Sequence, residues 1–188
     1  TTKVQRAPFG SFHNRVWVTL AKTILKQGLW NFFDSQTDFA RQLTGFEPNF
    51  KFEKHDTEGG EQVTSLKEMV HKLKNDLNVK NVYCWHALHG YWRGISSELG
   101  EKIGIEVKQV HPKATNHLLK LDPQAEFDPP SLFGVGMITK EKDLKTFYEH
   151  IHAPLVEAGI DGVKIDVQSG VTAAGSGVGG GPHVARLY

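Results

Sequence analysis

Residues 158–168 (AGIDGVKIDVQ) constrain the fold more than any other part of this 188-residue chain. Gly159 is the kind of residue that ends a helix in the left-handed conformation. The β-branched residues that follow it are typical of a parallel strand that is covered on both faces. The segment therefore predicts a helix end, a tight turn and a buried strand that finishes at Asp166.

Lys164 and Asp166 are two residues apart, so the pleat of a strand places both side chains on one face. A cation beside a carboxylate at the carboxyl end of a parallel strand occupies the position where α/β barrels carry their chemistry. A structural ion pair explains the same two residues equally well, and the residues alone leave both interpretations open. Asp161 lies at the other end of the strand and on its opposite face, so it cannot act with Asp166 as a glycosidase pair.

The rest of the chain alternates helical and extended patterns. Apolar residues recur at helical spacing in three segments, residues 14–27, 62–76 and 140–157, and we expect Thr139 to start the last of these. A second apolar strand is predicted over residues 81–88. Residues 44–52 and 89–131 lack periodicity and are predicted to be loops, the second unusually long. This order of elements predicts an α/β fold with a parallel sheet.

The charge balance excludes two classes of partner. Twenty-two basic and 21 acidic side chains leave a formal charge of +1, which predicts no nucleic-acid-binding surface. No apolar run approaches the roughly 20 residues that span a bilayer, so no membrane partner is expected. The single cysteine, Cys84, excludes an internal disulfide and fits a reducing compartment.

Aromatic and histidine side chains gather where the predicted strand 81–88 ends. Trp85 and His86 close this strand and Trp92 follows it. Rings at such a position can stack on the apolar face of a sugar, although packing in the core is the alternative that composition favours. His86 and His89 have H-x-x-H spacing, but a metal site needs three or four ligands, so we expect no metal.

The glycine-rich segment 175–180 (GSGVGG) satisfies the G-x-G-x-x-G pattern of dinucleotide-binding proteins. That pattern requires a strand directly before it, a helix directly after it and an acidic residue about 20 positions on. The segment lies several residues beyond the predicted strand, and the sequence indicates no clear helix after it. We therefore interpret the match as chance, and we expect the glycines to form a flexible active-site loop.

Three blocks in order carry a resemblance to a known family: residues 41–52 (RQLTGFEPNFKF), 82–94 (VYCWHALHGYWRG) and 158–168. Together they resemble the plant raffinose synthases and seed-imbibition proteins, which are related to alkaline α-galactosidases. The tail 179–188 (GGGPHVARLY) is similar to the stretch that follows the nucleophile in that family. The resemblance runs, with interruptions, from about Thr37 to Tyr188.

The resemblance implies part of a (β/α)8 TIM barrel, roughly two βα units plus long loops, that transfers α-galactosyl groups with retention. Galactinol would donate to sucrose, so the partners would be small carbohydrates, with no cofactor and no metal. By resemblance, Asp166 is the nucleophile and Lys164 contacts the galactose. Trp85 lines the sugar site, and His86 and Trp92 are further substrate-binding candidates. The alternatives are an alkaline α-galactosidase that uses water as acceptor, or a non-catalytic galactoside-binding relative.

The same resemblance divides the chain into an unassigned segment, 1–36, and a partial catalytic barrel domain, 37–188. The family carries an Asp-Asp-Gly-Trp block on an earlier strand, and no such block occurs before Thr37. The acid/base carboxylate is expected on a strand after Tyr188. We therefore expect this chain to be an incomplete product with no significant activity of its own. The resemblance implies a cytoplasmic enzyme, or alternatively a plastidial one.

Overall fold

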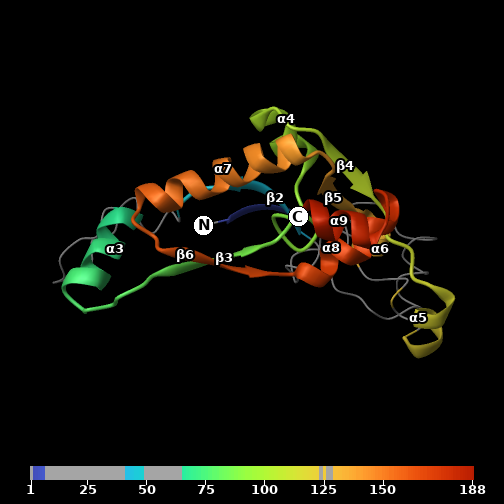
Figure 1. Ribbon diagram of the computed structural model, residues 1–188, viewed down its shortest axis with the longest axis horizontal. Coiled ribbons are helices and arrows are strands. Elements are labelled where there is room, and N and C mark those ends of the chain that lie inside the picture. The colour runs from blue at the N-terminus through green and yellow to red at the C-terminus, as the bar shows by residue number, and fades with distance from the viewer. Residues whose placement is uncertain (1, 7–40, 49–64, 123–124, 126–128) are drawn as a thin grey trace.

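The computed structural model describes residues 2–6, 41–48, 65–122, 125 and 129–188 (Figure 1). In the first half of the chain the elements are β1 (Thr2–Arg6), β2 (Arg41–Phe46), α3 (Leu66–Asn75), β3 (Tyr83–Ala87), α4 (Ser97–Ile103) and β4 (Val107–Val110). In the second half they are α5 (Asn116–Leu121), α6 (Pro129–Phe133), β5 (Val135–Ile138), α7 (Glu141–Glu157), β6 (Gly162–Asp166), α8 (Gln168–Ala174) and α9 (Gly181–Leu187). The helix predicted over 14–27 lies outside the described residues.

Two antiparallel strand pairs are joined into one mixed sheet by the short extended segment 93–96. β1 pairs with β2, and β4 pairs with β5, in both cases antiparallel. Segment 93–96 runs parallel to β2 and β5 and bonds to both, because Leu43 N donates to Gly94 O (2.9 Å) and Ile95 N donates to Gly136 O (3.1 Å). The sheet order is therefore β1, β2, 93–96, β5, β4.

Glycine is required where segment 93–96 pairs with β5. A Cβ atom on Gly136 would collide with the carbonyl oxygen of Ile95. A Cβ atom on Gly94 would collide with the carbonyl oxygen of Gly136. Gly94 also has a φ of +69°, in the left-handed region that favours glycine. Because both obstructing atoms belong to the backbone, a larger residue at either position would force the strands apart.

The strand that ends at Asp166 forms the parallel pair that the sequence predicted. β3 and β6 run in register from Tyr83 opposite Gly162 to Ala87 opposite Asp166. The α/β class is confirmed, but the expectation of a purely parallel sheet is wrong, because β4 and β5 pair antiparallel. The described strands do not close into a barrel.

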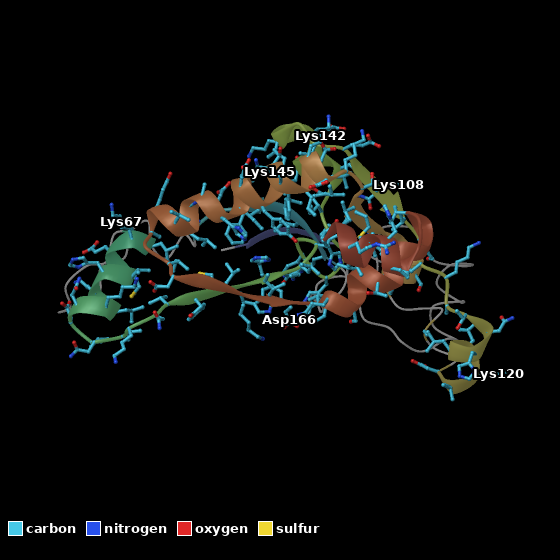
Figure 2. All side chains as sticks on the ribbon, in the orientation of Figure 1. Lys67, Lys108, Lys120, Lys142, Lys145 and Asp166 are labelled. Atoms are coloured by element: carbon cyan, nitrogen blue, oxygen red, sulfur yellow. The ribbon has the colours of Figure 1, made fainter. Side chains whose placement is uncertain are left out.

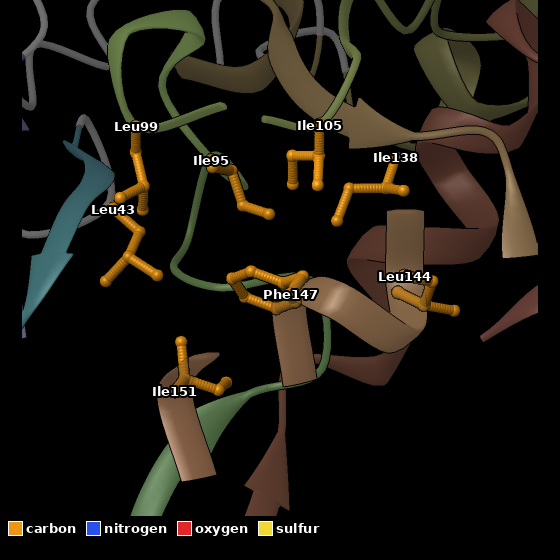
Figure 3. Packing of buried hydrophobic residues seen from close by; sticks show 8 residues of the cluster. All are labelled: Leu43, Ile95, Leu99, Ile105, Ile138, Leu144, Phe147 and Ile151. Atoms are coloured by element: carbon orange, nitrogen blue, oxygen red, sulfur yellow. The ribbon is translucent and has the colours of Figure 1, made fainter. Parts of the chain in front are cut away.

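The largest buried apolar cluster fixes α7 against the mixed sheet. Figure 3 shows Phe147 at its centre, and this side chain has no exposed surface. The cluster comprises Leu43, Ile95, Leu99, Ile105, Ile138, Leu144, Phe147 and Ile151. α7 also extends along the β3–β6 ribbon, with α3 at one end of it and α8 and α9 at the other (Figure 1). One helix therefore holds both groups of strands.

The glycine-rich tail packs on the opposite side of β5, in contrast to the flexible loop that we expected. It forms α8, a 3-10 turn at Gly175–Gly177, and α9. The buried residues of this second cluster are Val110, Val135, Met137, Val171, Ala174 and Val184. A Cβ on Gly175 would approach the Cα of Gly181 to 2.8 Å, and one on Gly177 would approach the Cβ of Val110 to 2.8 Å. The glycines allow close packing here.

Three further boundaries differ from the sequence-based expectations. Residues 89–131 hold α4, β4, α5 and the start of α6, elements of four to seven residues that are too short to show a clear period. Residues 44–46 belong to β2, because β1 and segment 93–96 pair with that strand on either side. Thr139 does not cap α7, since its N-cap residue is Lys140, which makes no side-chain capping bond. The helix predicted over 62–76 is confirmed over Leu66–Asn75 as α3, with Ser65 as its N-cap, and residues 62–64 lie outside the described residues.

Candidate functional site

The parallel pair brings Trp85, Lys164 and Asp166 together on one face. Trp85 lies opposite Lys164 in the register, and Asp166 follows two positions along the same strand. The indole Nε1 of Trp85 donates to Asp166 Oδ2 at 3.0 Å, and Lys164 Nζ approaches the same oxygen at 3.4 Å. Figure 2 shows Asp166 at the point where β6 meets α8. The alternation that the sequence predicted therefore produces one carboxylate with two cationic or polar donors beside it.

Asp166 is held as a carboxylate by hydrogen bonds. The Trp85 indole N–H, followed by the Val167 backbone N–H at 2.9 Å from Oδ1, lowers the pKa of the Asp166 carboxyl below its ordinary value. Lys164 lowers the pKa further but contributes least, because its side chain is 70% exposed. The arrangement provides an ionised, partly exposed carboxylate whose two oxygens are held by hydrogen bonds.

The backbone directly after Asp166 is strained. Val167 has φ 60° and ψ 31°, a left-handed conformation that is rarely adopted by a β-branched residue. In this conformation its N–H reaches the Asp166 side chain, and its carbonyl accepts from Gly170 N at 3.2 Å to open α8. Strain of this kind costs on the order of 1–3 kcal/mol and clusters at functional sites. It is a second feature that marks this strand end.

His86 lies on the other face of β3, away from Asp166. Its side chain is buried, and its Nε2 lies 3.1 Å from Nε2 of His152 on α7. Its Nδ1 is 2.9 Å from the carbonyl of Ala87. The pleat explains this separation, because Trp85 and His86 are neighbours in a strand and must point to opposite faces. Of the predicted site residues, His86 thus faces α7 and not the carboxylate.

Asp161 is structural. Its Oδ1 accepts from Lys74 Nζ at 2.8 Å, and its Oδ2 accepts from Val82 N at 2.8 Å. The Lys74 hydrogen bond, with the Val82 N–H, lowers the pKa of the Asp161 carboxyl. These contacts connect α3 with the start of the β3–β6 pair, at the end remote from Asp166.

A pocket of about 400 Å³ lies beside this strand end. Trp92 lines it, together with His89, which the sequence suggested only through its H-x-x-H spacing. Gly170 and Ala173 of α8 contribute one wall, and the segment before α5 contributes another. Among residues 41–48, 65–122 and 129–188, no three His, Cys, Asp or Glu side chains cluster as a metal site would require. His86 and His89, the two histidines of the H-x-x-H spacing, lie in different environments, because His86 faces α7 and His89 lines this pocket.

His89 is expected to stay neutral well below neutral pH. Its side chain is fully buried, and this burial lowers the pKa of its imidazole to about 4. The folded state thus binds fewer protons than the unfolded state between about pH 6.5 and 4, so stability should fall as the pH falls through that window. NMR of ¹³C-labelled histidine should show one ring titrating near pH 4. Titration of every ring near pH 6.5 would contradict the buried placement of His89.

The hydrogen bond from Trp85 to Asp166 leads to a second prediction, which concerns the pH dependence of activity. In a full-length enzyme that carries this chain, Trp85→Phe should move the acid limb of the kcat/KM profile to higher pH. Removing the N–H raises the pKa of Asp166, and a carboxyl group that acts as a nucleophile must be ionised to react. Lys164→Met is the comparison, with a smaller shift expected. An unmoved limb in Trp85→Phe, or a larger shift in Lys164→Met, would count against this order of contributions.

Together these features define an α/β protein in which a tryptophan, a lysine and an aspartate converge at the carboxyl end of a parallel strand pair. A model of the family described as raffinose synthase or seed imbibition protein Sip1 matches residues 21–188. The chain therefore belongs to the raffinose synthase and seed-imbibition family. The match begins inside the segment 1–36, which the sequence blocks left unassigned.

Individual relatives agree with this assignment. A probable galactinol–sucrose galactosyltransferase 6 of Arabidopsis thaliana is 35% identical over 147 residues, which is 78% of this chain and 18% of that protein. The corresponding figures for the probable galactosyltransferase 1 of the same plant are 31% identity over 82% of this chain and 21% of that protein. The galactinol–sucrose galactosyltransferase of Pisum sativum is 32% identical over 78% of this chain and 18% of its own length. The chain thus spans about a fifth of the length of these relatives.

No helix within the described residues has the length and apolar character needed to cross a membrane.

Proposed function

We propose that this chain forms the nucleophile-bearing part of a retaining galactosyltransferase that moves an α-galactosyl group from galactinol to sucrose. The observation that carries the proposal is the position of Asp166. It ends a parallel strand and accepts hydrogen bonds from Trp85 and from its own following amide. The names of the relatives, galactinol–sucrose galactosyltransferases, supply the substrate class.

The proposed reaction has two displacements. In the first, an Asp166 oxygen bonds to the galactosyl anomeric carbon as the bond to the inositol oxygen breaks, and a second carboxyl group protonates that oxygen. In the second, a sucrose hydroxyl attacks the same carbon, its proton returns to the second carboxyl group, and the Asp166 carboxylate is released. Trp85 and Lys164 would orient Asp166 and the sugar on the face that they share.

Parallel pairing of β3 and β6, with Asp166 at the carboxyl end, is also the local geometry of a (β/α)8 barrel. We propose that these two strands belong to such a barrel in a protein of the length of the relatives. The mixed sheet would then pack beside the barrel strands through α7, which contacts both.

The acceptor distinguishes the proposal from an alkaline α-galactosidase. A full-length protein carrying this chain should be incubated with galactinol, with and without sucrose, and the products separated by anion-exchange chromatography. The proposal predicts raffinose when sucrose is present and little free galactose. Release of galactose at the same rate with and without sucrose would support the hydrolase, and galactoside binding without product would support a non-catalytic relative.

A further inference from the structure

The pocket of about 400 Å³ that His89 and Trp92 line lies beside the strand end that carries Asp166. It adjoins the ends of both parallel strands, because Leu88 N donates to Asp166 O (2.8 Å) and His89 follows directly. Gly170, on the opposite wall, is so close that a Cβ there would lie 3.0 Å from His89 Cε1. Trp85, Lys164 and Asp166 do not line the pocket. The pocket therefore lies next to the end of the strand pair and does not include the Asp166 carboxylate.

His89 is the polar group that calls for a ligand. It has no exposed surface, and neither Nδ1 nor Nε2 meets hydrogen-bond geometry with any described residue. The backbone of Trp92 lies beside the imidazole and offsets part of the lowering that burial imposes on the His89 pKa. Buried polar groups are almost always paired, so the imidazole at this pocket wall has hydrogen-bonding capacity that a ligand could use.

The other lining residues indicate which ligand fits. Beside the Trp92 ring, the wall is mainly apolar, with Pro112, Leu118 and Pro130 among its residues. Within the described part of the chain, Lys113 also lines the pocket, as do the hydroxyl residues Thr115, Ser131 and Ser176, and no carboxylate does. A neutral imidazole offers one donor and one acceptor, which matches the two roles of a hydroxyl group. Apolar walls with a few polar groups, in a volume between about 300 and 1,000 Å³, are typical of small-molecule sites.

We infer that this pocket binds the acceptor sugar, a neutral saccharide such as sucrose, with Trp92 against its C–H face and His89 bonded to its hydroxyl groups. The role of this sugar as the acceptor rests on the proposed galactosyl transfer. The binding site itself rests on His89 and the pocket. The pocket brings a bound sugar to the side of Asp166, from which a hydroxyl could approach the galactosyl carbon.

Ala173→Leu is the direct test, with Ala153→Leu as its control. Ala173 is an exposed helical residue that lines the pocket, and Ala153 is an exposed helical residue of α7 that does not. In a full-length protein carrying this chain, Ala173→Leu should weaken sucrose binding, measured by saturation-transfer NMR, by about tenfold or more, because the larger side chain fills the site. The KM for sucrose should rise equally. Ala153→Leu should leave both values unchanged.

The outcomes separate this inference from the proposed function. Sucrose binding that depends on Ala173, in a protein without galactosyl transfer, would uphold the pocket and overturn the transferase. Transfer to sucrose with the same KM and affinity in Ala173→Leu and wild type would overturn the pocket and uphold the transferase. Binding of inorganic phosphate, lost in Ala173→Leu and without any binding of sucrose, would identify an anion site and overturn the inference. Thermal melts of both variants exclude loss of the fold.

Discussion

Asp166→Asn should lower kcat by at least about three orders of magnitude in a full-length enzyme that carries this chain, with galactinol and sucrose as substrates. The change removes the charge and the nucleophilicity but little volume, and a covalent nucleophile cannot be replaced by an amide. The amide oxygen can still accept from Trp85 Nε1, so galactinol binding should change little. Initial rates and a binding isotherm on the same preparation measure both quantities.

Asp161→Asn is the matched control, because it makes the same chemical change at the other end of the same strand. Asp161 pairs with Lys74 and Val82 and lies away from the proposed centre. We expect a small loss of stability and a kcat close to that of the wild type. An Asp166→Asn enzyme that kept a tenth of its turnover, or equal losses in the two variants, would refute the nucleophile assignment.

Phe147→Ala should destabilise the packing of α7 by about 3–5 kcal/mol, the usual cost of emptying a large buried aromatic site. Phe147 is fully buried at the centre of the cluster that joins α7 to the mixed sheet (Figure 3). Hydrogen exchange of the α7 peptides, followed by mass spectrometry, measures the free energy of opening of this helix.

Val156→Ala on the same helix is the comparison for the packing prediction. Its side chain is 72% exposed, so we expect a change of less than about 0.5 kcal/mol. Equal exchange in the two variants would show that the cluster around Phe147 does not hold α7 in place.

The residues that sequence alone could place are those governed by a short, regular period. Lys164 and Asp166 share a face because they alternate in a buried strand, and the register then brings Trp85 to the same face. The same alternation of side chains along β3 places His86 on the opposite face. Sequence reasoning grouped it with Trp85 by proximity along the chain, whereas the pleat separates neighbours.

The features that the sequence did not predict depend on contacts between segments that are distant in the chain. The mixed sheet forms because segment 93–96 inserts between β2 and β5, and the close approach of Gly94 to Gly136 that allows this joins residues far apart in the sequence. The tail packs as helices because its small residues fit against Val110 and Val184 on the far side of β5, a fit that composition alone presents as flexibility. The pocket at His89 joins four separate stretches of chain, so no local motif marks it.

The central claim is that Asp166 becomes bonded to the galactosyl group. A full-length enzyme should be incubated with an activated fluorinated α-galactoside, chosen so that its glycosyl-enzyme forms faster than it breaks down, then digested and analysed by tandem mass spectrometry. The account predicts one added fluorogalactosyl group on the peptide that contains residues 165–168, with fragment ions placing it on Asp166. An adduct on any other carboxylate, while that peptide stays unmodified and the enzyme is inactivated, would contradict it.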